Sequence, residues 1–224
     1  MPGNRCGRYQ LLELLGRGGM ADVYAACRAD VDGPRSRFAL KLLQRKWSLD
    51  PQLRAMFESE ARLTISLNHP NLVRVYEAGE HLGVPFMVME YVDGVSCAKI
   101  LRTVASRGER FPAGPALVIC AEVLKGLIHA HGATDEQNLP LGIVHRDVSP
   151  GNILISRSGR IKLADFGIAR SSQIDHHTDP GQVKGKFGYM SPEQVLGQDE
   201  LDARSDLFSL GVVLAEMLLG RRLF

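Results

Sequence analysis

The chain has few cysteines, and their spacing argues against a cysteine metal site and against a disulfide framework. Cys6, Cys27, Cys97 and Cys120 are scattered along 224 residues and show none of the paired spacing of a metal site. Scattered single thiols of this kind are typical of reduced proteins rather than of disulfide-rich secreted ones. We therefore expect a cytoplasmic protein whose cysteines are small buried thiols.

Long apolar segments and an excess of one charge are also missing. The first ten residues lack the apolar run of a signal peptide, and the longest apolar run, residues 208–219, contains Glu216 and is too short for a bilayer. Lysine and arginine total 27 against 25 acidic residues, a formal net charge of +2. We expect neither nucleic acid nor a membrane as a partner.

With 45% hydrophobic residues, the chain has enough apolar side chains for a substantial core. The first part, residues 1–92, contains short strand-like runs bounded by glycine, proline or aspartate: YQLLELLG, DVYAACRA, RFALKLL, LVRVYEAG and FMVMEYV. One helix is predicted over residues 52–67, after Asp50-Pro51, because apolar residues recur at helical spacing there.

Helices dominate the second part, residues 93–224. We predict helices near residues 115–131 and 203–219, and two short strands at residues 153–156 and 161–163. The pattern favours an α+β fold of two lobes, one an antiparallel sheet with one helix and the other mainly helical, with a hinge at residues 90–94.

The segment 15–24, Leu-Gly-Arg-Gly-Gly-Met-Ala-Asp-Val-Tyr, lies between two predicted strands. Glycines such as Gly16 and Gly18 let a tight turn bring backbone N–H groups against phosphate oxygens. Alone, such a segment is usually only a turn. It lacks the Lys-Ser/Thr of a Walker loop and leads into a strand rather than a helix, which argues against P-loop and Rossmann sites.

Lys41 lies in the predicted strand Phe-Ala-Leu-Lys-Leu-Leu. By itself it can simply be the outward residue of an alternating strand. Glu60, on the helix that follows, offers an ion-pair partner that would aim the Lys41 ammonium at phosphates.

The most specific segment is Val144-His-Arg-Asp-Val-Ser-Pro-Gly-Asn152. Asp147 and Asn152 are five positions apart on a loop that ends in a buried strand, so a proton-accepting carboxylate and a metal-ligating amide oxygen come together. After the next strand, Asp165 in Asp-Phe-Gly supplies the carboxylate that would complete an all-oxygen Mg²⁺ site.

Taken together and in this order, these segments resemble the protein kinase family from about Tyr9 to Phe224. Gly-Gly-Met in the glycine-rich segment and Tyr-Met-Ser-Pro-Glu at residues 189–193 resemble its bacterial, Hanks-type serine/threonine branch. The resemblance implies a two-lobed protein-kinase-like fold and transfer of the γ-phosphoryl group of ATP, with Mg²⁺ or Mn²⁺, to a serine or threonine of a protein substrate in signalling.

The resemblance also implies a role for each matching residue. Asp147 would be the catalytic base, Lys41 would contact the α- and β-phosphates, and Glu60 would position Lys41. Asn152 and Asp165 would hold the metal, and Asp206 would anchor the backbone of the catalytic loop. The nucleotide would lie against Leu15, Gly16, Gly18, Val23, Ala39, Lys41, Met89, Leu154 and the backbone of Glu90 and Val92.

Three residues depart from the family pattern. Ala21 replaces the third loop glycine, Ser149 stands where a lysine contacts the γ-phosphate, and Lys186 stands where a threonine faces that lysine. The last two look like an exchange, so that the Lys186 ammonium restores the positive charge near Asp147. The alternative is a solvated Lys186 and a Ser149 that merely costs activity.

Regulation by phosphorylation of the activation loop is poorly supported by the sequence. Arg146 is the arginine that usually receives the phosphate, but the usual phosphosite resembles Gln182. The nearest loop hydroxyls are Ser171, Ser172 and Thr178.

A complete domain of the family continues beyond Phe224, so we expect the helical lobe to be incomplete. Glu193 would then lack its usual arginine and be left unpaired, and an apolar patch would be exposed on the helix at residues 203–219.

Two other functions stay open. One is an inactive, pseudokinase-like binding module, and the other is a small-molecule phosphotransferase. Asp165-Phe166-Gly167 and the segment 185–193, which shapes a groove for a peptide, argue against the second. The residues do not indicate an oligomeric state.

Overall fold

The structure is a computed structural model that describes residues 5–30, 36–167, 187–198 and 200–224. The chain divides into two compact units. The first comprises Met1–Ser66 and Arg74–Tyr91, and the second comprises Leu67–Val73 and Val92–Phe224.

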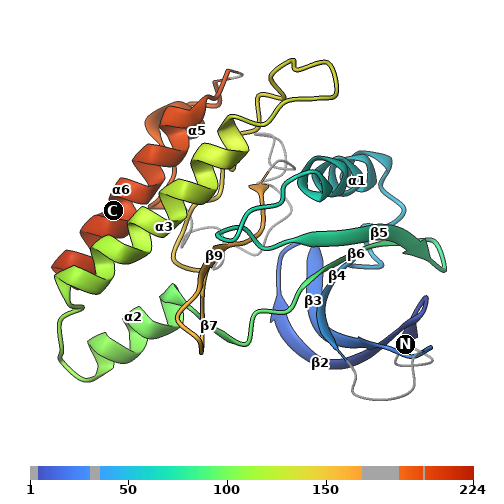
Figure 1. The fold of residues 1–224 in the computed structure, drawn as a ribbon, viewed down its shortest axis with the longest axis horizontal. Coiled ribbons are helices and arrows are strands. Elements are labelled where there is room, and N and C mark those ends of the chain that lie inside the picture. The colour runs from blue at the N-terminus through green and yellow to red at the C-terminus, as the bar shows by residue number, and fades with distance from the viewer. Residues whose placement is uncertain (1–4, 31–35, 168–186, 199) are drawn as a thin grey trace. The chain divides into compact units, whose positions relative to one another are not determined.

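The first unit is built on a six-stranded antiparallel sheet (Figure 1). All five predicted strands are confirmed, and a short β1 joins them at one edge. The spatial order is β1-β2-β3-β4-β6-β5. The bounds are β1 (Arg5–Cys6), β2 (Tyr9–Arg17), β3 (Ala21–Arg28), β4 (Arg37–Leu43), β5 (Val75–His81) and β6 (Val84–Glu90).

Helix α1 (Pro51–Ile65) packs against β5 and β6 of the same unit and confirms the predicted helix. Asp50 caps its first turn, since its Oδ1 accepts hydrogen bonds from Gln52 N at 2.9 Å and Leu53 N at 3.2 Å. Pro51 fits the first helical position, where no amide donor is needed. The buried face of α1 carries Leu53, Phe57, Glu60, Ala61 and Thr64.

The second unit contains the helices and a small sheet. Predicted helices and strands are confirmed as α3 (Ala113–His131), α6 (Ala203–Leu219), β8 (Ile153–Ser156) and β9 (Ile161–Leu163). Elements that the sequence did not reveal are β7 (Gly94–Ser96), α2 (Cys97–Ser106) and the short α5 (Pro192–Val195). The sheet is antiparallel, in the order β7-β8-β9.

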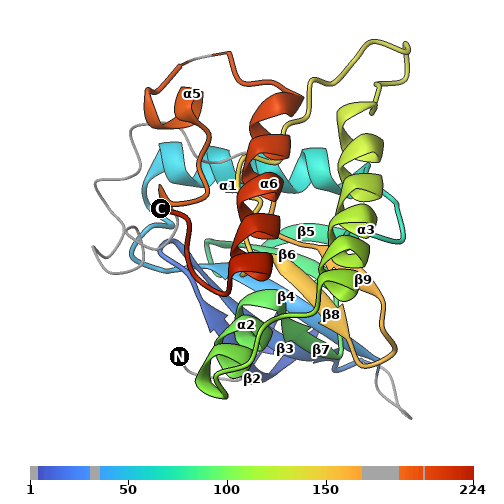
Figure 2. The same ribbon diagram turned by 90° about the vertical axis from the view of Figure 1, so that its left-hand side faces the viewer.

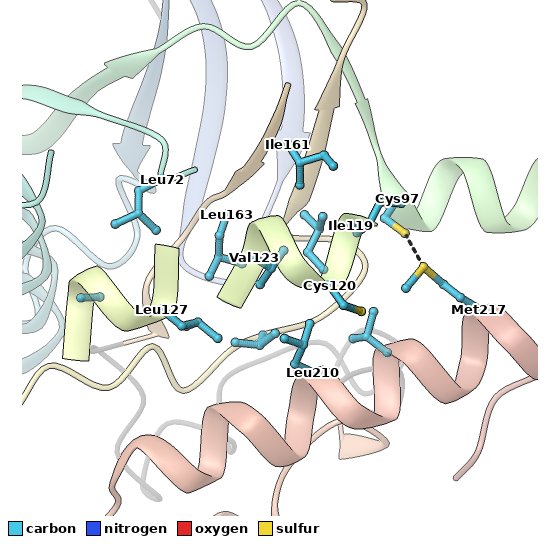
Figure 3. Packing of buried hydrophobic residues seen from close by; sticks show 14 of the residues in the cluster. Leu72, Cys97, Ile119, Cys120, Val123, Leu127, Ile161, Leu163, Leu210 and Met217 are labelled. Atoms are coloured by element: carbon cyan, nitrogen blue, oxygen red, sulfur yellow. Dashed lines mark hydrogen bonds between the residues drawn. The ribbon is translucent and has the colours of Figure 1, made fainter. Parts of the chain in front are cut away.

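The core of the second unit lies between α3, α6 and β9. Figure 2 shows α3 and α6 side by side, and Figure 3 shows the side chains that fill the space between these elements. The labelled members are Leu72, Cys97, Ile119, Cys120, Val123, Leu127, Ile161, Leu163, Leu210 and Met217.

Residues 67–73 belong to the second unit, although the predicted boundary placed all of residues 1–92 in the first. The physical reason is a pair of backbone hydrogen bonds with β9. Val73 N donates to Leu163 O at 2.9 Å, and Leu163 N donates to Asn71 O at 2.8 Å. Leu72, between them, is buried in the core.

Helix α3 is the one helix among the described residues with the length and apolar composition of a membrane span. Its contacts explain that composition in another way, because seven of its residues are buried, among them Ile119, Val123 and Leu127 in the shared core with α6 and β9. All four cysteines are buried, as the sequence predicted.

Candidate functional site

Lys41 and Glu60 form the predicted ion pair in the first unit. The Lys41 Nζ–Glu60 Oε1 distance is 2.6 Å, and the two side chains are only 14% and 5% exposed. The pair joins β4 to α1. Because breaking a buried pair leaves an uncompensated charge, this contact fixes both the ammonium and the helix that faces it.

The strand register brings most of the predicted nucleotide-binding residues of the first unit together. Gly16 pairs with Val23 across β2 and β3, and Val23 pairs with Lys41 across β3 and β4. Ala39 pairs with Met89 across β4 and β6.

The strand pairing does not bring the other predicted nucleotide-binding residues into this group. Leu15 lies in β2 next to Gly16 and is exposed, Gly18 lies at the loop tip, and Glu90 ends β6. Val92 and Leu154 belong to the second unit. The roles of all these residues toward a nucleotide stay predictions.

In the second unit, Asp206 holds the loop that carries Asp147. Its carboxylate is fully buried and accepts hydrogen bonds from His145 N and Arg146 N, both at 2.8 Å. His131, at the end of α3, donates to the same carboxylate from Nε2 at 2.8 Å. The predicted anchoring role of Asp206 is confirmed, and His131 is a partner that the sequence did not reveal.

Asp147 and Asn152 lie in direct contact on this loop. Asn152 Nδ2 donates to the backbone oxygen of Asp147 and to its Oδ2, both at 2.8 Å. These bonds fix the carboxylate and use both amide protons. The remaining polar atom of the Asn152 side chain is Oδ1, a hard oxygen ligand.

The segment Ala164–Gly167 is hydrogen-bonded through its backbone to the same loop. Ala164 N donates to Asn152 O at 2.8 Å, and Gly167 N donates to His145 O at 2.7 Å. A side chain at Gly167 would put a Cβ 2.9 Å from the Cβ of Asp147, so only glycine fits there. The structure therefore brings Asp147, Asn152 and the backbone of Asp165 together.

The donor set of this region fits magnesium that is held partly by phosphate. Among the described residues, no group of three or more histidine, cysteine or acidic side chains could hold a metal ion by itself. Asn152 Oδ1 and the Asp165 carboxylate would supply oxygen ligands, and Mg²⁺ usually completes such a pair with water and phosphate oxygens.

Comparison with known proteins decides the family. Residues 9–224 match the protein kinase domain. The chain belongs to this family. The chain spans about a third of the length of the curated relatives that it matches.

Two relatives are bacterial kinases with different named specificities. The chain is 38% identical to the tyrosine-protein kinase MasK of Myxococcus xanthus, over 97% of this chain and 34% of MasK. It is 40% identical to the serine/threonine-protein kinase PknB of Mycobacterium tuberculosis, over 98% of this chain and 33% of PknB.

Among solved structures, the PknI kinase domain of Mycobacterium tuberculosis matches with a TM-score of 0.72 and 29% identity. The match covers 99% of this chain and 78% of that one. The predicted fold class, a protein-kinase-like α+β fold with an antiparallel sheet unit and a helical unit, is confirmed.

Glu193 of this kinase domain has a hydrogen-bond partner that the sequence did not predict. Ser205, fully buried near the start of α6, donates from Oγ to Glu193 Oε1 at 2.6 Å. This hydrogen bond is the main cause that lowers the pKa of Glu193 below its usual value. The expected apolar exposure on α6 is present, and its residues are Leu207, Phe208, Leu218 and Leu219.

Gln194 is a contact of the catalytic loop that the sequence did not reveal. Its Nε2 donates to Arg146 O at 2.9 Å, and its Oε1 accepts from Ser191 N at 3.0 Å. The capping box of α5, formed by Ser191 and Gln194, fixes the orientation of this amide. Arg146 has a positive φ of 64°, a backbone conformation that is unfavourable for a residue other than glycine. The side chains of Asp206 and Gln194 hold it there through hydrogen bonds to the Arg146 N–H and C=O groups.

Ser149 is buried, and its Oγ has no hydrogen-bond partner among the described residues. Lys186, its predicted counterpart, lies outside the described residues, as do Ser171, Ser172, Thr178 and Gln182. The proposed exchange between Ser149 and Lys186 therefore stays a prediction.

His145 is neutral in this arrangement. Its ring is fully buried against Phe166, with ring centroids 4.5 Å apart, and burial lowers the pKa of His145 despite the nearby acidic groups. Nδ1 accepts from Asp147 N at 3.2 Å, which leaves Nε2 to donate to Ala164 O at 3.1 Å. The neutral ring thus bridges the catalytic loop and the segment that carries Asp165.

We predict that His145 makes stability depend on pH. An unfolded histidine titrates near pH 6.5, whereas the folded ring resists protonation, so its contribution is complete above about pH 6.5 and is lost as pH falls toward the lowered pKa. Urea unfolding between pH 7.5 and 5.5 checks this. The free energy of unfolding should fall up to about 1.4 kcal/mol per pH unit more steeply than in a folded His145→Phe variant. Equal slopes would contradict it.

Proposed function

We propose that this chain is the catalytic domain of a protein serine/threonine kinase that uses Mg-ATP. The observation that carries the proposal is the Asp147–Asn152 contact on a loop whose backbone is held by buried Asp206. A carboxylate for the acceptor proton and an amide oxygen for the metal are thereby fixed side by side. The buried Lys41–Glu60 pair supplies the ammonium that kinases use on phosphates.

In the proposed reaction, an acceptor hydroxyl loses its proton to the Asp147 carboxylate while its oxygen forms a bond to the γ-phosphorus of ATP. The bond between that phosphorus and the β,γ-bridging oxygen breaks, and ADP leaves with the electron pair. Lys41 binds phosphate oxygens and Glu60 orients Lys41. Asn152 and Asp165 would hold Mg²⁺, which would neutralise charge on the phosphates.

A protein serine or threonine is the acceptor that we propose. The names of relatives such as PknB of Mycobacterium tuberculosis and PrkC of Bacillus subtilis support this choice. MasK is named a tyrosine kinase, and the buried Ser149 removes the lysine that usually supports serine/threonine transfer. Peptides that differ only in a serine, threonine or tyrosine acceptor, assayed with radiolabelled ATP, decide between them.

Asp147→Asn should abolish most phosphoryl transfer, because an amide cannot accept the acceptor proton. We expect kcat to fall by about 10²- to 10⁴-fold, with ATP affinity largely retained. The matched control is Glu136→Gln, an equivalent change at an exposed position, which should leave kcat unchanged.

Other outcomes of that assay identify the alternatives. Wild-type protein that binds ATP without any turnover is a binding module. Transfer to small alcohols in preference to peptides indicates a small-molecule phosphotransferase. Undiminished turnover by the Asp147→Asn variant contradicts the assigned base.

Lys186→Met tests the proposed exchange with Ser149. If the Lys186 ammonium stabilises the transferring phosphoryl group, kcat should fall by orders of magnitude while the KM for ATP changes little. Lys184→Met, two residues away, removes the same charge and should have little effect. An unchanged rate in the Lys186→Met variant rules out the exchange.

A further inference from the structure

The tip of the glycine-rich loop is hydrogen-bonded to the segment that joins β4 to α1. Gln44 Nε2 donates to Gly18 O at 2.9 Å, Trp47 Nε1 donates to Gly19 O at 3.1 Å, and Gln44 N donates to Met20 O at 2.8 Å. Three consecutive carbonyl groups of the loop are thus bound by one short segment of the same unit.

The loop itself is a tight turn. Gly18 N donates to Ala21 O at 2.8 Å, and a Cβ at Gly18 would lie 3.0 Å from that oxygen. A side chain at Gly18 would therefore press on the turn. With only Gly19 and Met20 between the two residues, the loop has little freedom to reorient its peptide groups.

The segment that binds the loop is itself well fixed. Trp47 N donates to Gln44 O at 2.8 Å, Ser48 Oγ donates to Arg45 O at 2.8 Å, and Asp50 N donates to Trp47 O at 3.1 Å. The segment begins after β4 and ends at Asp50, the residue that caps α1. Lys41 lies on β4, and Glu60 lies on α1. The Lys41–Glu60 ion pair ties these two elements together, so the segment is held at both ends.

The orientation of the loop amides follows from these bonds. In a trans peptide the C=O and the next N–H point to opposite sides, and none of the described residues has a cis peptide bond. Since the carbonyls of Gly18, Gly19 and Met20 face the segment, the N–H groups of Gly19, Met20 and Ala21 point away from it. Successive N–H groups that point the same way form an anion-binding concavity.

We propose that Gln44 and Trp47 are positioning residues for the phosphates of a bound nucleotide. They hold the loop carbonyls so that its N–H donors are already oriented when the phosphates arrive, which lowers the ordering cost of binding. Neither side chain touches the nucleotide in this proposal. The inference rests on the proposed function, because it assumes that the glycine-rich loop binds ATP.

Calorimetric titration with Mg-ATP, Mg-ADP and adenosine tests the proposal without requiring catalysis. Trp47→Phe keeps an aromatic ring and removes the N–H donor, and it should weaken ATP and ADP binding roughly two- to tenfold. Gln44→Glu removes the donor to Gly18 O and sets a carboxylate beside Asp22, which Gln44 now contacts at 3.0 Å, so its effect should be at least as large. Adenosine has no phosphates, and its affinity should be unchanged in both variants.

The matched control is Gln52→Glu, which adds the same charge on an exposed side chain in the first turn of α1. It should bind all three ligands as the wild type does. Trp47 is the single tryptophan of the chain, so its emission spectrum in the Gln44→Glu variant reports whether the surrounding fold is intact.

The outcomes separate this inference from the proposed function. If the wild type binds ATP more tightly than adenosine and both variants keep that ratio, the positioning role is overturned and ATP binding stands. Equal weakening of adenosine and ATP in the variants also overturns it, because it indicates general damage to the fold. A wild type that binds no nucleotide overturns the proposed function, and this inference with it.

Discussion

The arrangement of the catalytic loop depends on one buried carboxylate. Asp206 has no exposed surface, and burying its charge is unfavourable unless hydrogen bonds compensate for lost water. The backbone amides of His145 and Arg146 and the ring of His131 provide that compensation. These two amides belong to the residues immediately before Asp147. The hydrogen bonds that stabilise the Asp206 carboxylate therefore also fix the backbone that carries the proposed base.

Each further group at the site is held by polar contacts of the same kind. Arg146 is held through its amide by Asp206 and through its carbonyl by Gln194, and its left-handed conformation is maintained by both. The neutral ring of His145 then links this loop to Ala164. In the first unit, the glycine-rich loop is held through its carbonyls. In both units, side chains from distant parts of the sequence fix backbone groups. The proposed chemistry belongs to other groups, namely the Asp147 carboxylate, Asn152 Oδ1 and the N–H groups of the glycine-rich loop.

Sequence reasoning succeeded where function is encoded locally. The strands and main helices follow from periodicity, and Asp147 and Asn152 meet because they are five positions apart on one loop. The Lys41–Glu60 ion pair could be predicted because a strand that carries the lysine is followed by an amphipathic helix that carries the glutamate. The bonds from Gln194 to Arg146 and from Trp47 to Gly19 were missed because their acceptors are backbone carbonyls, which carry no residue identity. Ser205, the hydrogen-bond partner of Glu193, was missed because a serine before Asp206 has no distinctive spacing.

A crystal structure with Mg²⁺ and a non-hydrolysable ATP analogue tests the central claim most directly. We predict a magnesium ion bound by Asn152 Oδ1, the Asp165 carboxylate and phosphate oxygens. Asn152 Nδ2 should still donate to Asp147, and Asp206 should still hold the two loop amides. A metal ion bound elsewhere, or an Asn152 side chain turned so that its Nδ2 faces the metal, would contradict the account.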